Sequence, residues 1–311
     1  MQIIKTVFTD FDLYNATVQE WQLHYNILSK NDFRAELNMF SENHFALSRV
    51  SLQGKLVHSG VTPKGFRTIV IPKNYDDKFI WYNKGAGGNE LLIFREDGVL
   101  DAVTFSDFDA YVISIENEFL DKMITELGYH KCKDAFVASE MEFHLTETFA
   151  QNFHQLANYL LNEYIKDVNF TVENQAIHDK LIYEIIYEIL TYIERTPIKK
   201  TIKRRGKKET ALKEIVEILS KDHENLYSVK ELSILTNISE RSLLSAFKEK
   251  YEVSPSEFIK ATRLNKVKNE LFALKGQDIT IATIAGKHQF WHMGQFAKDF
   301  KKQFGILPSE V

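Results

Sequence analysis

Apolar and polar positions alternate in short segments over roughly the first 120 residues of the chain. A short polar helix is expected at 12–19, and eight segments rich in β-branched and aromatic residues follow at regular intervals, several separated by Gly-containing turns. These segments are 21–28, 33–40, 45–52, 55–59, 66–71, 79–82, 91–94 and 111–115. Short strands at such spacing predict a β-barrel or a β-sandwich.

The period of the pattern becomes helical between residues 144 and 195. Apolar residues recur there at spacings of three and four, which predicts two amphipathic helices. One stripe is Leu145, Phe149, Phe153, Leu156, Leu160 and Tyr164, and the other is Ile177, Leu181, Ile185, Ile189 and Ile193. Each stripe could pack on the core of its own chain or against a second copy. Pro197 ends the second helix, and a basic linker follows at 199–208.

The last third of the chain contains one apolar pattern twice, 53 positions apart. Phe247-Lys248, Tyr251, Val253 and Pro255-Ser256-Glu257 recur as Phe300-Lys301, Phe304, Ile306 and Pro308-Ser309-Glu310. An internal repeat of this kind predicts two copies of one supersecondary unit.

The first copy has the pattern of two helices joined by a sharp turn. Ser228 and Glu231 have capping-box spacing, Asn237 tolerates the left-handed backbone of a turn, and a second helix follows at about 240–251. The face of the first helix carries Leu232 and Leu235. This arrangement predicts a helix-turn-helix, whose second helix enters the DNA major groove.

The residues that would face DNA follow from the inward positions of each second helix. Leu243 and Phe247 point inward in the first copy, and Phe296 and Phe300 do so in the second, at about 291–304 after a helix at 280–285. The predicted DNA-facing residues are Arg241, Leu244, Ser245, Lys248, His292, Met293, Ala297 and Lys298.

Two of these residues have distinct predicted roles. Arg241 is the candidate base reader, because a guanidinium can bond guanine O6 and N7 together. Lys298 is the candidate phosphate contact, whereas Trp291 fits either packing or contact. A continuous helix at 258–274, roughly 25 Å long, would hold the two recognition helices about one DNA turn apart, roughly 34 Å.

These residues resemble the AraC/XylS-type transcription regulators over about 209–310. The resemblance rests on Ser239, Leu243, Phe247-Lys248, Arg263-Leu264, Ile284-Ala285, Phe290, Phe296, Phe300-Lys301, Phe304-Gly305 and Pro308-Ser309. The stretch 290–297 is closest to a subgroup that includes the ethanolamine-utilisation regulator. The resemblance implies an α+β chain. The resemblance also implies three parts: a cupin-like β-barrel for effector binding at 1–140, a helical dimerisation and linker region at 141–208, and an all-α tandem helix-turn-helix domain at 209–311.

Three positions depart from the pattern of that family. Glu252 and Gln289 stand where Gly is usual, and Gly294 stands where Ser is usual, so each affects a local turn or helix start. Gly294 costs up to about 1 kcal/mol relative to Ala in a helix. We therefore expect the second recognition helix to order fully only on DNA.

Charge divides the chain in the same place as the repeat does. Residues 199–311 hold 22 Lys+Arg and 14 Asp+Glu, a net charge of +8, whereas the preceding residues hold 17 and 29, a net of −12. Such a split is typical of a nucleic-acid-binding part joined to another domain. The single Cys132 excludes an intrachain disulfide, and the N-terminal segment lacks a secretory apolar core, which favours a cytoplasmic protein without membrane segments.

The barrel mouth is the expected site for a small-molecule effector. The weak aromatic candidates are Trp21, Tyr25, Phe40, Phe45 and Trp81, any of which could instead fill the core. His24, His44 and His58 are isolated in sequence, so no metal is expected. The glycines at 85–88 indicate a flexible turn rather than a phosphate loop. Neither a cofactor nor a catalytic residue is predicted.

The favoured function is an effector-responsive DNA-binding transcription regulator. The expected partners are double-stranded operator DNA, a small molecule, a second copy through the region between barrel and DNA-binding domain, and RNA polymerase if the protein activates. One alternative is a constitutive regulator whose barrel only oligomerises. Another is a cupin-type enzyme fused to a DNA-binding domain, which would require a metal or reactive group within residues 1–120.

Overall fold

A computed structural model describes residues 2–18, 24–28, 33–74, 78–81, 84–87, 89–94, 96, 99–105, 108–137, 141–166, 172–198, 206–221, 225 and 227–311. The strands are β1 (Gln2–Phe8), β2 (His24–Ile27), β3 (Arg34–Glu42), β4 (Phe45–Gln53), β5 (Leu56–Val61), β6 (Phe66–Pro72), β7 (Lys78–Trp81), β8 (Lys84–Gly87), β9 (Glu90–Phe94), β10 (Val99–Thr104), β11 (Phe108–Glu116) and β12 (Met141–His144). The helices are α1 (Phe11–Thr17), α2 (Asn117–Leu127), α3 (His130–Val137), α4 (Glu147–Lys166), α5 (Val172–Arg195), α6 (Lys207–Lys221), α7 (Val229–Leu235), α8 (Glu240–Tyr251), α9 (Pro255–Ala273), α10 (Ile281–Lys287) and α11 (Met293–Phe304).

The N-terminal strands form two antiparallel sheets. The seven-stranded sheet has the order β1-β3-β4-β11-β6-β9-β12, and the five-stranded sheet has the order β2-β5-β10-β7-β8. The α+β fold with a cupin-like N-terminal domain is confirmed. The described strands form an open sandwich, which is one of the two arrangements that the strand pattern predicted, and not the barrel that the family resemblance implied. The expected flexible glycine turn is wrong, because residues 85–87 lie in β8 and pair with β7.

Several elements have no counterpart in the predicted set: β1, β8, β10, β12, α2, α3 and α6. β1 is an edge strand whose residues are mostly exposed, so its sequence carries little apolar alternation. β8 and β12 are four residues long, too short for a clear pattern. α2 ends at Gly128, whose φ of 68° is the left-handed conformation that Gly adopts readily.

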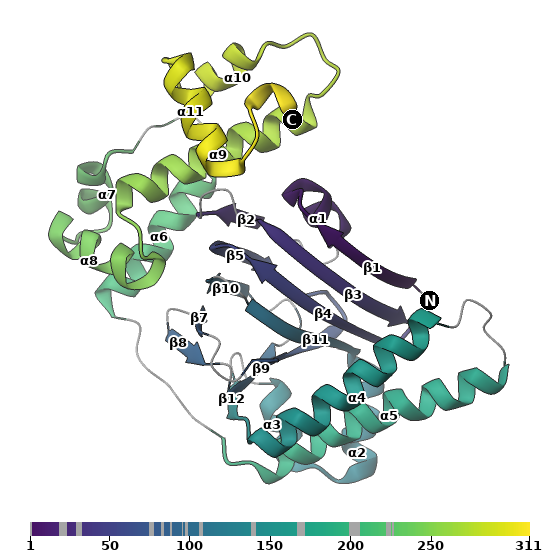
Figure 1. Cartoon of the computed structure of the whole chain (residues 1–311). Helices are drawn as coiled ribbons and strands as arrows, with labels where there is room; N and C mark the ends of the chain where they lie inside the picture. Colours follow the sequence, from purple (N-terminus) through teal and green to yellow (C-terminus); the bar gives the residue numbers. More distant parts are fainter. Residues whose placement is uncertain are drawn as a thin grey trace.

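Helices α2 to α5 cover one face of the seven-stranded sheet and share its largest core (Figure 1). Most residues of both predicted helical stripes are buried in this core, including Phe153, Leu160, Ile185 and Ile189. Ile177 differs, since it is 56% exposed at the start of α5. The stripes therefore pack on their own sandwich. Among the described helices, none combines the length and apolarity needed to cross a membrane.

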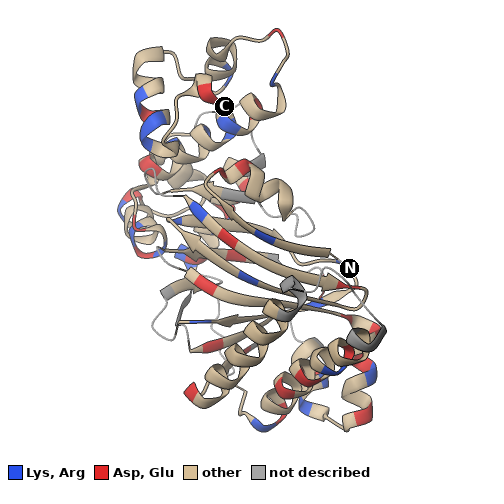
Figure 2. Cartoon of the chain, turned by 45° about the vertical axis from the view of Figure 1, so that its right-hand side comes forward, with Lys and Arg blue, Asp and Glu red and all other residues tan. Residues whose placement is uncertain are grey.

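The C-terminal helices form two small cores joined by α9. One core contains residues of α6, α8 and α9 around Phe247, and the other contains residues of α9, α10 and α11 around Phe300. Figure 2 shows Lys and Arg on the helices near the C-terminus and acidic residues along the helices at the opposite end of the molecule. The tandem arrangement and the unequal charge thus coincide in space.

Candidate DNA-binding surface and effector cavity

The first helix-turn-helix is formed by α7 and α8 and has the predicted caps. The Ser228 Oγ accepts from the Glu231 N–H at 3.2 Å, and the Ser228 N–H donates to the Glu231 carboxylate at 2.8 Å. The turn passes through Asn237, whose φ is 52°. The Ser239 Oγ then accepts from the Ser242 N–H at 3.2 Å and starts α8.

The predicted DNA-facing side of α8 is accessible. Leu243 and Phe247 are fully buried, whereas Arg241, Leu244 and Lys248 are exposed. Ser245 is half-buried and already bonded: it donates to the Glu249 carboxylate at 2.6 Å and accepts from the Lys208 ammonium of α6 at 3.1 Å. On the neighbouring helix α7, Leu232 is buried, whereas Leu235 near the end of the same face is 56% exposed.

The second helix-turn-helix is formed by α10 and α11. Thr280 caps α10 as predicted, but α11 begins at Met293, two residues later than expected, and His292 makes no side-chain capping bond. Phe296 and Phe300 are buried. Of the predicted DNA-facing residues here, His292, Met293 and Lys298 are exposed and Ala297 is half-buried. Trp291 precedes the helix and is 73% exposed, so it is available for contact rather than packed in the core.

The positions that depart from the usual family residues keep the turns. Glu252 ends α8 with a φ of 54°, and its carboxylate contacts the Lys55 ammonium of the sandwich at 2.5 Å. Gln289 has a φ of 61°, and the Arg263 guanidinium donates to the carbonyl oxygens of His288 and Gln289 at 2.7 and 2.8 Å. Side chains from elsewhere in the molecule thus contact both left-handed residues.

The linking helix α9 begins three residues earlier than predicted. Ser254 and Glu257 form a capping box around Pro255, which suits the first helical position. Its 19 residues give a length of roughly 28 Å. Arg263 lies in the middle of α9, 4.5 Å above the Phe290 ring, so the same helix that spaces the two units also fixes the turn of the second.

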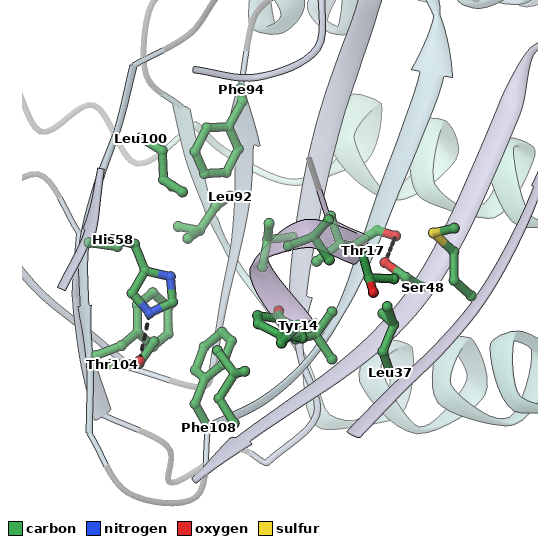
Figure 3. A pocket seen from close by; sticks show the side chains of 18 of the residues that line it. Tyr14, Thr17, Leu37, Ser48, His58, Leu92, Phe94, Leu100, Thr104 and Phe108 are labelled. Atoms are coloured by element: carbon green, nitrogen blue, oxygen red, sulfur yellow. Dashed lines mark hydrogen bonds between the residues drawn. The ribbon is translucent and has the colours of Figure 1, made fainter. Parts of the chain in front are cut away.

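A cavity of about 160 Å³ lies inside the sandwich (Figure 3). Its described lining comes from α1 and both sheets: Gln2, Tyr14, Thr17, Val18, Leu37, Met39, Ser48, Val50, Leu52, His58, Val70, Phe79, Leu92, Phe94, Leu100, Ala102, Thr104, Phe108 and Val112. The His58 Nε2 lies 2.8 Å from the Thr104 Oγ1. Burial lowers the pKa of His58 to about 3, so the imidazole is neutral at physiological pH.

The aromatic candidates for effector contact do not line this cavity where the structure describes them. Phe40 and Phe45 are buried on the opposite face of the seven-stranded sheet, in the core shared with α2 to α5. Trp21 and the side chains of Tyr25 and Trp81 lie outside the described part of the chain. The lining residue Phe79 was missed because strand alternation alone does not say which face of a two-faced sheet is hollow. Phe108 lies before the predicted strand, and Tyr14 lies on α1, whose packing over the sheets only the tertiary structure shows.

The five-stranded sheet separates this cavity from the DNA-binding domain. Along β10, Leu100, Ala102 and Thr104 line the cavity, whereas Asp101 and Val103 point the other way, as strand geometry requires. Val103 packs in the core of the first helix-turn-helix, and the Asp101 carboxylate accepts from the Lys250 ammonium of α8 at 2.9 Å. Opposite faces of one strand therefore contact the cavity and α8.

Helix α1 makes a second connection between the cavity and the C-terminal helices. Tyr14 and Thr17 line the cavity, and Asp12 on the same helix pairs with the Lys268 ammonium of α9 at 2.5 Å. Both partners are buried. Burial raises the pKa of Asp12, and Lys268 opposes that rise. Beside them, the Asn265 side chain of α9 bonds the backbone N–H and carbonyl of Ile27 at 3.2 and 3.3 Å.

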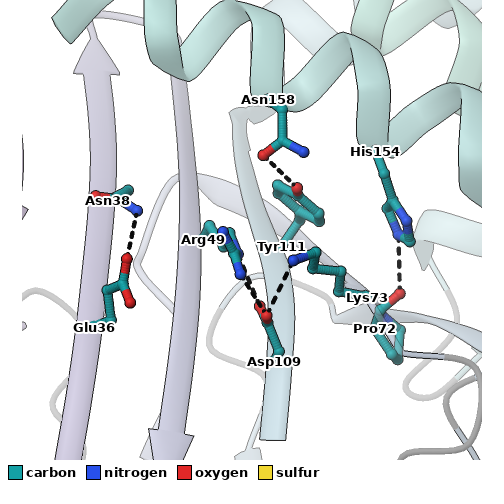
Figure 4. Close-up of polar contacts among 9 residues, drawn as sticks. All are labelled: Glu36, Asn38, Arg49, Pro72, Lys73, Asp109, Tyr111, His154 and Asn158. Carbon is teal, nitrogen blue, oxygen red and sulfur yellow. Dashed lines mark hydrogen bonds and ion pairs between the residues drawn. The ribbon is translucent and has the colours of Figure 1, made fainter.

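A separate polar cluster fastens α4 to the seven-stranded sheet (Figure 4). The Arg49 guanidinium donates twice to Asp109, at 3.0 and 2.7 Å, and Lys73 lies 3.5 Å from the same carboxylate. The Tyr111 hydroxyl donates to Asn158 of α4 at 2.8 Å, and burial raises the pKa of Tyr111 to about 12. The Tyr111–Asn158 bond and the contact of His154 with the Pro72 carbonyl at 3.1 Å join α4 to the sheet, whereas Arg49, Asp109 and Lys73 connect neighbouring strands of the sheet.

The histidines considered as metal ligands have other neighbours where they are described. His44 contacts the carboxylate of Glu116, and His58 contacts Thr104. The side chain of His24 lies outside the described part. Within the described residues, no group of three or more His, Cys, Asp or Glu side chains converges as metal ligands would.

Comparisons with known proteins place this geometry in a family. A family profile described as "Helix-turn-helix domain" matches residues 232–311. XylDLEGF operon transcriptional activator 1 of Pseudomonas putida is 21% identical over 224 residues, which are 71% of this chain and 66% of that protein. XylDLEGF operon transcriptional activator 3 of the same organism is 22% identical over 291 residues, which are 89% of this chain and 81% of that protein.

One solved structure is similar over the C-terminal third. It is a probable AraC family transcriptional regulator from Rhodopseudomonas palustris, 30% identical, with a TM-score of 0.31, and the match covers 32% of this chain and 93% of that one. The resemblance of residues 290–297 to the ethanolamine-utilisation subgroup stays a prediction. The repeated helix-turn-helix units, the profile match and the similarity to the XylDLEGF operon activators together show an AraC/XylS-type helix-turn-helix DNA-binding domain at the C-terminus of this chain.

Proposed function

We propose that this DNA-binding transcription regulator reads its operator with the exposed residues of α8 and α11. Arg241 would read a guanine in the first major groove, and Lys298 would contact a backbone phosphate in the second. Leu244, Lys248, His292 and Met293 complete the surface, with smaller roles for Ser245 and Ala297. The proposal is supported by the exposure of these side chains beside fully buried Leu243 and Phe247.

We further propose that the N-terminal sandwich, residues 1–140, binds a small-molecule effector in its cavity and that residues 141–208 connect it to the DNA-binding domain, residues 209–311. The observation that carries this proposal is the position of the five-stranded sheet, whose two faces contact the cavity and the first helix-turn-helix. A ligand that favours one arrangement of that sheet over another would shift the docking of α8 and α9, because coupling requires differential affinity for two arrangements.

The docked arrangement leaves the recognition surfaces open. Arg241, Lys248, His292 and Lys298 are all exposed while Asp12, Asp101 and Ile27 of the sandwich contact α9 and α8. Regulation by covering the DNA-binding residues is therefore disfavoured. The effector would instead change the relative position or freedom of the two recognition helices, which must match successive major grooves.

Other partners belong to the same proposal. A homodimer would double the operator contacts. Most of the two helical stripes is buried, so the candidates for its surface are Ile177, the exposed first residue of the second stripe, and the exposed Tyr183 of the same helix α5. Activation would require contact with RNA polymerase. Action on DNA favours the cytoplasm. The relatives are transcription activators, which favours a regulator over an enzyme. A constitutive regulator remains the alternative, in which no ligand changes operator affinity.

The test is retention of fragmented genomic DNA by the purified full chain at two salt concentrations, followed by sequencing. Salt governs the nonspecific background. Sequence-specific reading predicts a few enriched loci that share two half-sites about 10 base pairs apart. Uniform retention that disappears as salt rises, both with and without cell metabolites added, would contradict it. Enrichment that does not respond to any metabolite fraction would favour the constitutive alternative.

A further inference from the structure

The lining of the sandwich cavity points to a particular chemical class of effector. We propose that the effector is a small, uncharged, largely apolar molecule that carries one hydroxyl group, such as an aliphatic or aromatic alcohol or a phenol. This inference rests on the proposed function of the cavity and adds the identity of the ligand class to it.

The first observation is the character of the cavity wall. Most of the described lining is aliphatic or aromatic, including Leu37, Val70, Leu92 and Phe94, and the remaining described lining groups are neutral. Burying an ionised carboxylate or ammonium against such a wall is costly without an opposite charge. His58 is neutral because burial lowers its pKa to about 3, so it supplies no counter-charge at neutral pH.

The second observation is the orientation of the hydroxyl groups on the wall formed by α1 and the seven-stranded sheet (Figure 3). The Thr17 hydroxyl donates to the Leu13 carbonyl at 2.8 Å, and the Ser48 hydroxyl donates to the Val112 carbonyl at 3.4 Å. A hydroxyl that gives its proton to the backbone still has oxygen lone pairs to accept with. The wall therefore offers acceptors to a ligand that brings a donor, which an alcohol does and a carboxylate or an ether does not.

The third observation is size. A cavity of about 160 Å³ is comparable with apolar protein cavities that admit a benzene-sized molecule. The ligand should therefore have on the order of ten non-hydrogen atoms.

The experiment uses the full chain and three matched probes: benzyl alcohol, benzoate and benzyl methyl ether. Binding is measured by calorimetry and by the shift in melting temperature at pH 7.5. We expect benzyl alcohol to bind with a dissociation constant at least about tenfold below that of benzoate, because of the charge burial. The ether should bind less tightly than the alcohol by roughly threefold to tenfold, because it brings no donor.

Three variants locate the binding. Ala102→Leu adds volume inside the cavity and should abolish binding of all probes. Ser48→Ala removes one hydrogen-bond acceptor from the wall and leaves extra space. It should weaken alcohol binding and leave ether binding unchanged. This comparison remains informative even if the fold does not tolerate a larger side chain at position 102. Tyr159→Ala, at an exposed position of α4, is the control and should bind like the original chain.

Each other outcome overturns the inference. Benzoate binding as tight as the alcohol, and lost in Ala102→Leu, would mean an anionic ligand class and would leave the effector-responsive function intact. Equal binding of ether and alcohol would remove the hydroxyl from the proposal. No binding of any probe would remove the whole class. Retention of operator DNA, measured on the same samples, tests the proposed regulatory function independently of the ligand class.

Discussion

At the scale of single residues, Glu252 and Gln289 hold left-handed backbone with φ of 54° and 61°. Such a conformation costs roughly 1–2 kcal/mol for a residue with a Cβ. Arg263 bonds the carbonyl of Gln289, and Glu252 uses its side chain to reach Lys55 of the sandwich. A glycine at 252 would form the same turn but could not make that contact, so this departure from the family pattern serves docking between domains.

The two proposed DNA contacts differ in what their loss should do. Arg241→Ala should cost roughly 1–3 kcal/mol on the preferred operator and relax the preference at one base pair. Lys298→Ala should weaken all sequences alike and reduce the salt slope of binding by about one. Both are measured by titrating operators with single base changes at several salt concentrations. Equal losses on every base variant for Arg241→Ala would contradict its role as a reader.

His58 should make the sandwich sensitive to acid. Its pKa is about 3 in the fold, against about 6.5 when unfolded, so the unfolded chain takes up the proton first as the pH falls. The stability is fully present above about pH 6.5 and is lost progressively toward pH 3, with about 2 kcal/mol lost at pH 5.

Urea-induced unfolding at pH 7.5 and pH 5.0 measures this effect. His58→Gln should reduce the difference in the free energy of unfolding between the two pH values by about 2 kcal/mol. His44→Gln, whose side chain is 55% exposed, is the control and should leave the difference in place. An unchanged pH dependence in His58→Gln would contradict the assignment.

At the scale of elements, the start of α11 is the weakest point of the recognition surface. His292 provides no capping bond, and Gly294 is the second residue of the helix, where an added Cβ would meet nothing within 4 Å. The expectation that DNA completes the order of this helix therefore applies to its first turn, since Phe296 and Phe300 already fix the rest in the core.

Gly294→Ala should stabilise α11 by up to about 1 kcal/mol and slow amide exchange in its first turn by up to about fivefold in free protein. Operator affinity should rise by a similar factor, because less ordering remains to be done on binding. Gly276→Ala is the matched control, and it should lower the stability of the protein instead of raising it, because φ at 276 is 86° and Ala is strained in that conformation. Full protection of the first turn in the unchanged free protein would contradict the expectation.

At the scale of the whole molecule, contacts of different kinds hold the sandwich to the C-terminal helices. Val57 and Val103 add apolar packing, and Lys250 with Asp101 and Lys268 with Asp12 add ion pairs. The Asp12–Lys268 pair is buried on both sides, so loss of one partner should be far more disruptive than loss of an exposed pair. Single substitutions at these contacts should therefore weaken the packing of the sandwich against the C-terminal helices.

Asp12→Asn leaves the Lys268 ammonium buried beside a neutral amide, at a cost of about 3 kcal/mol or more. We expect faster hydrogen exchange in β2 and α9 and a larger radius of gyration in solution scattering. Replacing both partners, with Asn at 12 and Met at 268, should restore much of the docking. Glu184→Gln breaks the exposed pair with Lys180 on α5 and should change neither observable. An unaltered scattering profile for Asp12→Asn would contradict this account of docking.

Local signals determined much of what the sequence predicted. Ser228, Ser239 and Thr280 cap helices in the structure as their spacing predicts, because a cap depends on residues within one helical turn. For the same reason, the sequence predicted the repeat and the inward-facing phenylalanines of α8 and α11, which are buried in the structure. Alternation likewise predicted most of the strands, whereas the edge strand β1, the four-residue strands β8 and β12 and the central strand β10 were missed.

Only the tertiary structure shows which faces of the strands and helices pack against one another and which face lines the cavity. Strand period 2 says that Ala102 and Val103 face opposite ways, but only the packing of two sheets and α9 shows that one side is a cavity and the other is the first helix-turn-helix. Likewise, Phe40 and Phe45 are as apolar as true cavity residues, and their burial under α2 to α5 comes from residues about 80 or more positions away. Sequence periodicity fixes faces within an element, whereas long-range packing chooses their partners.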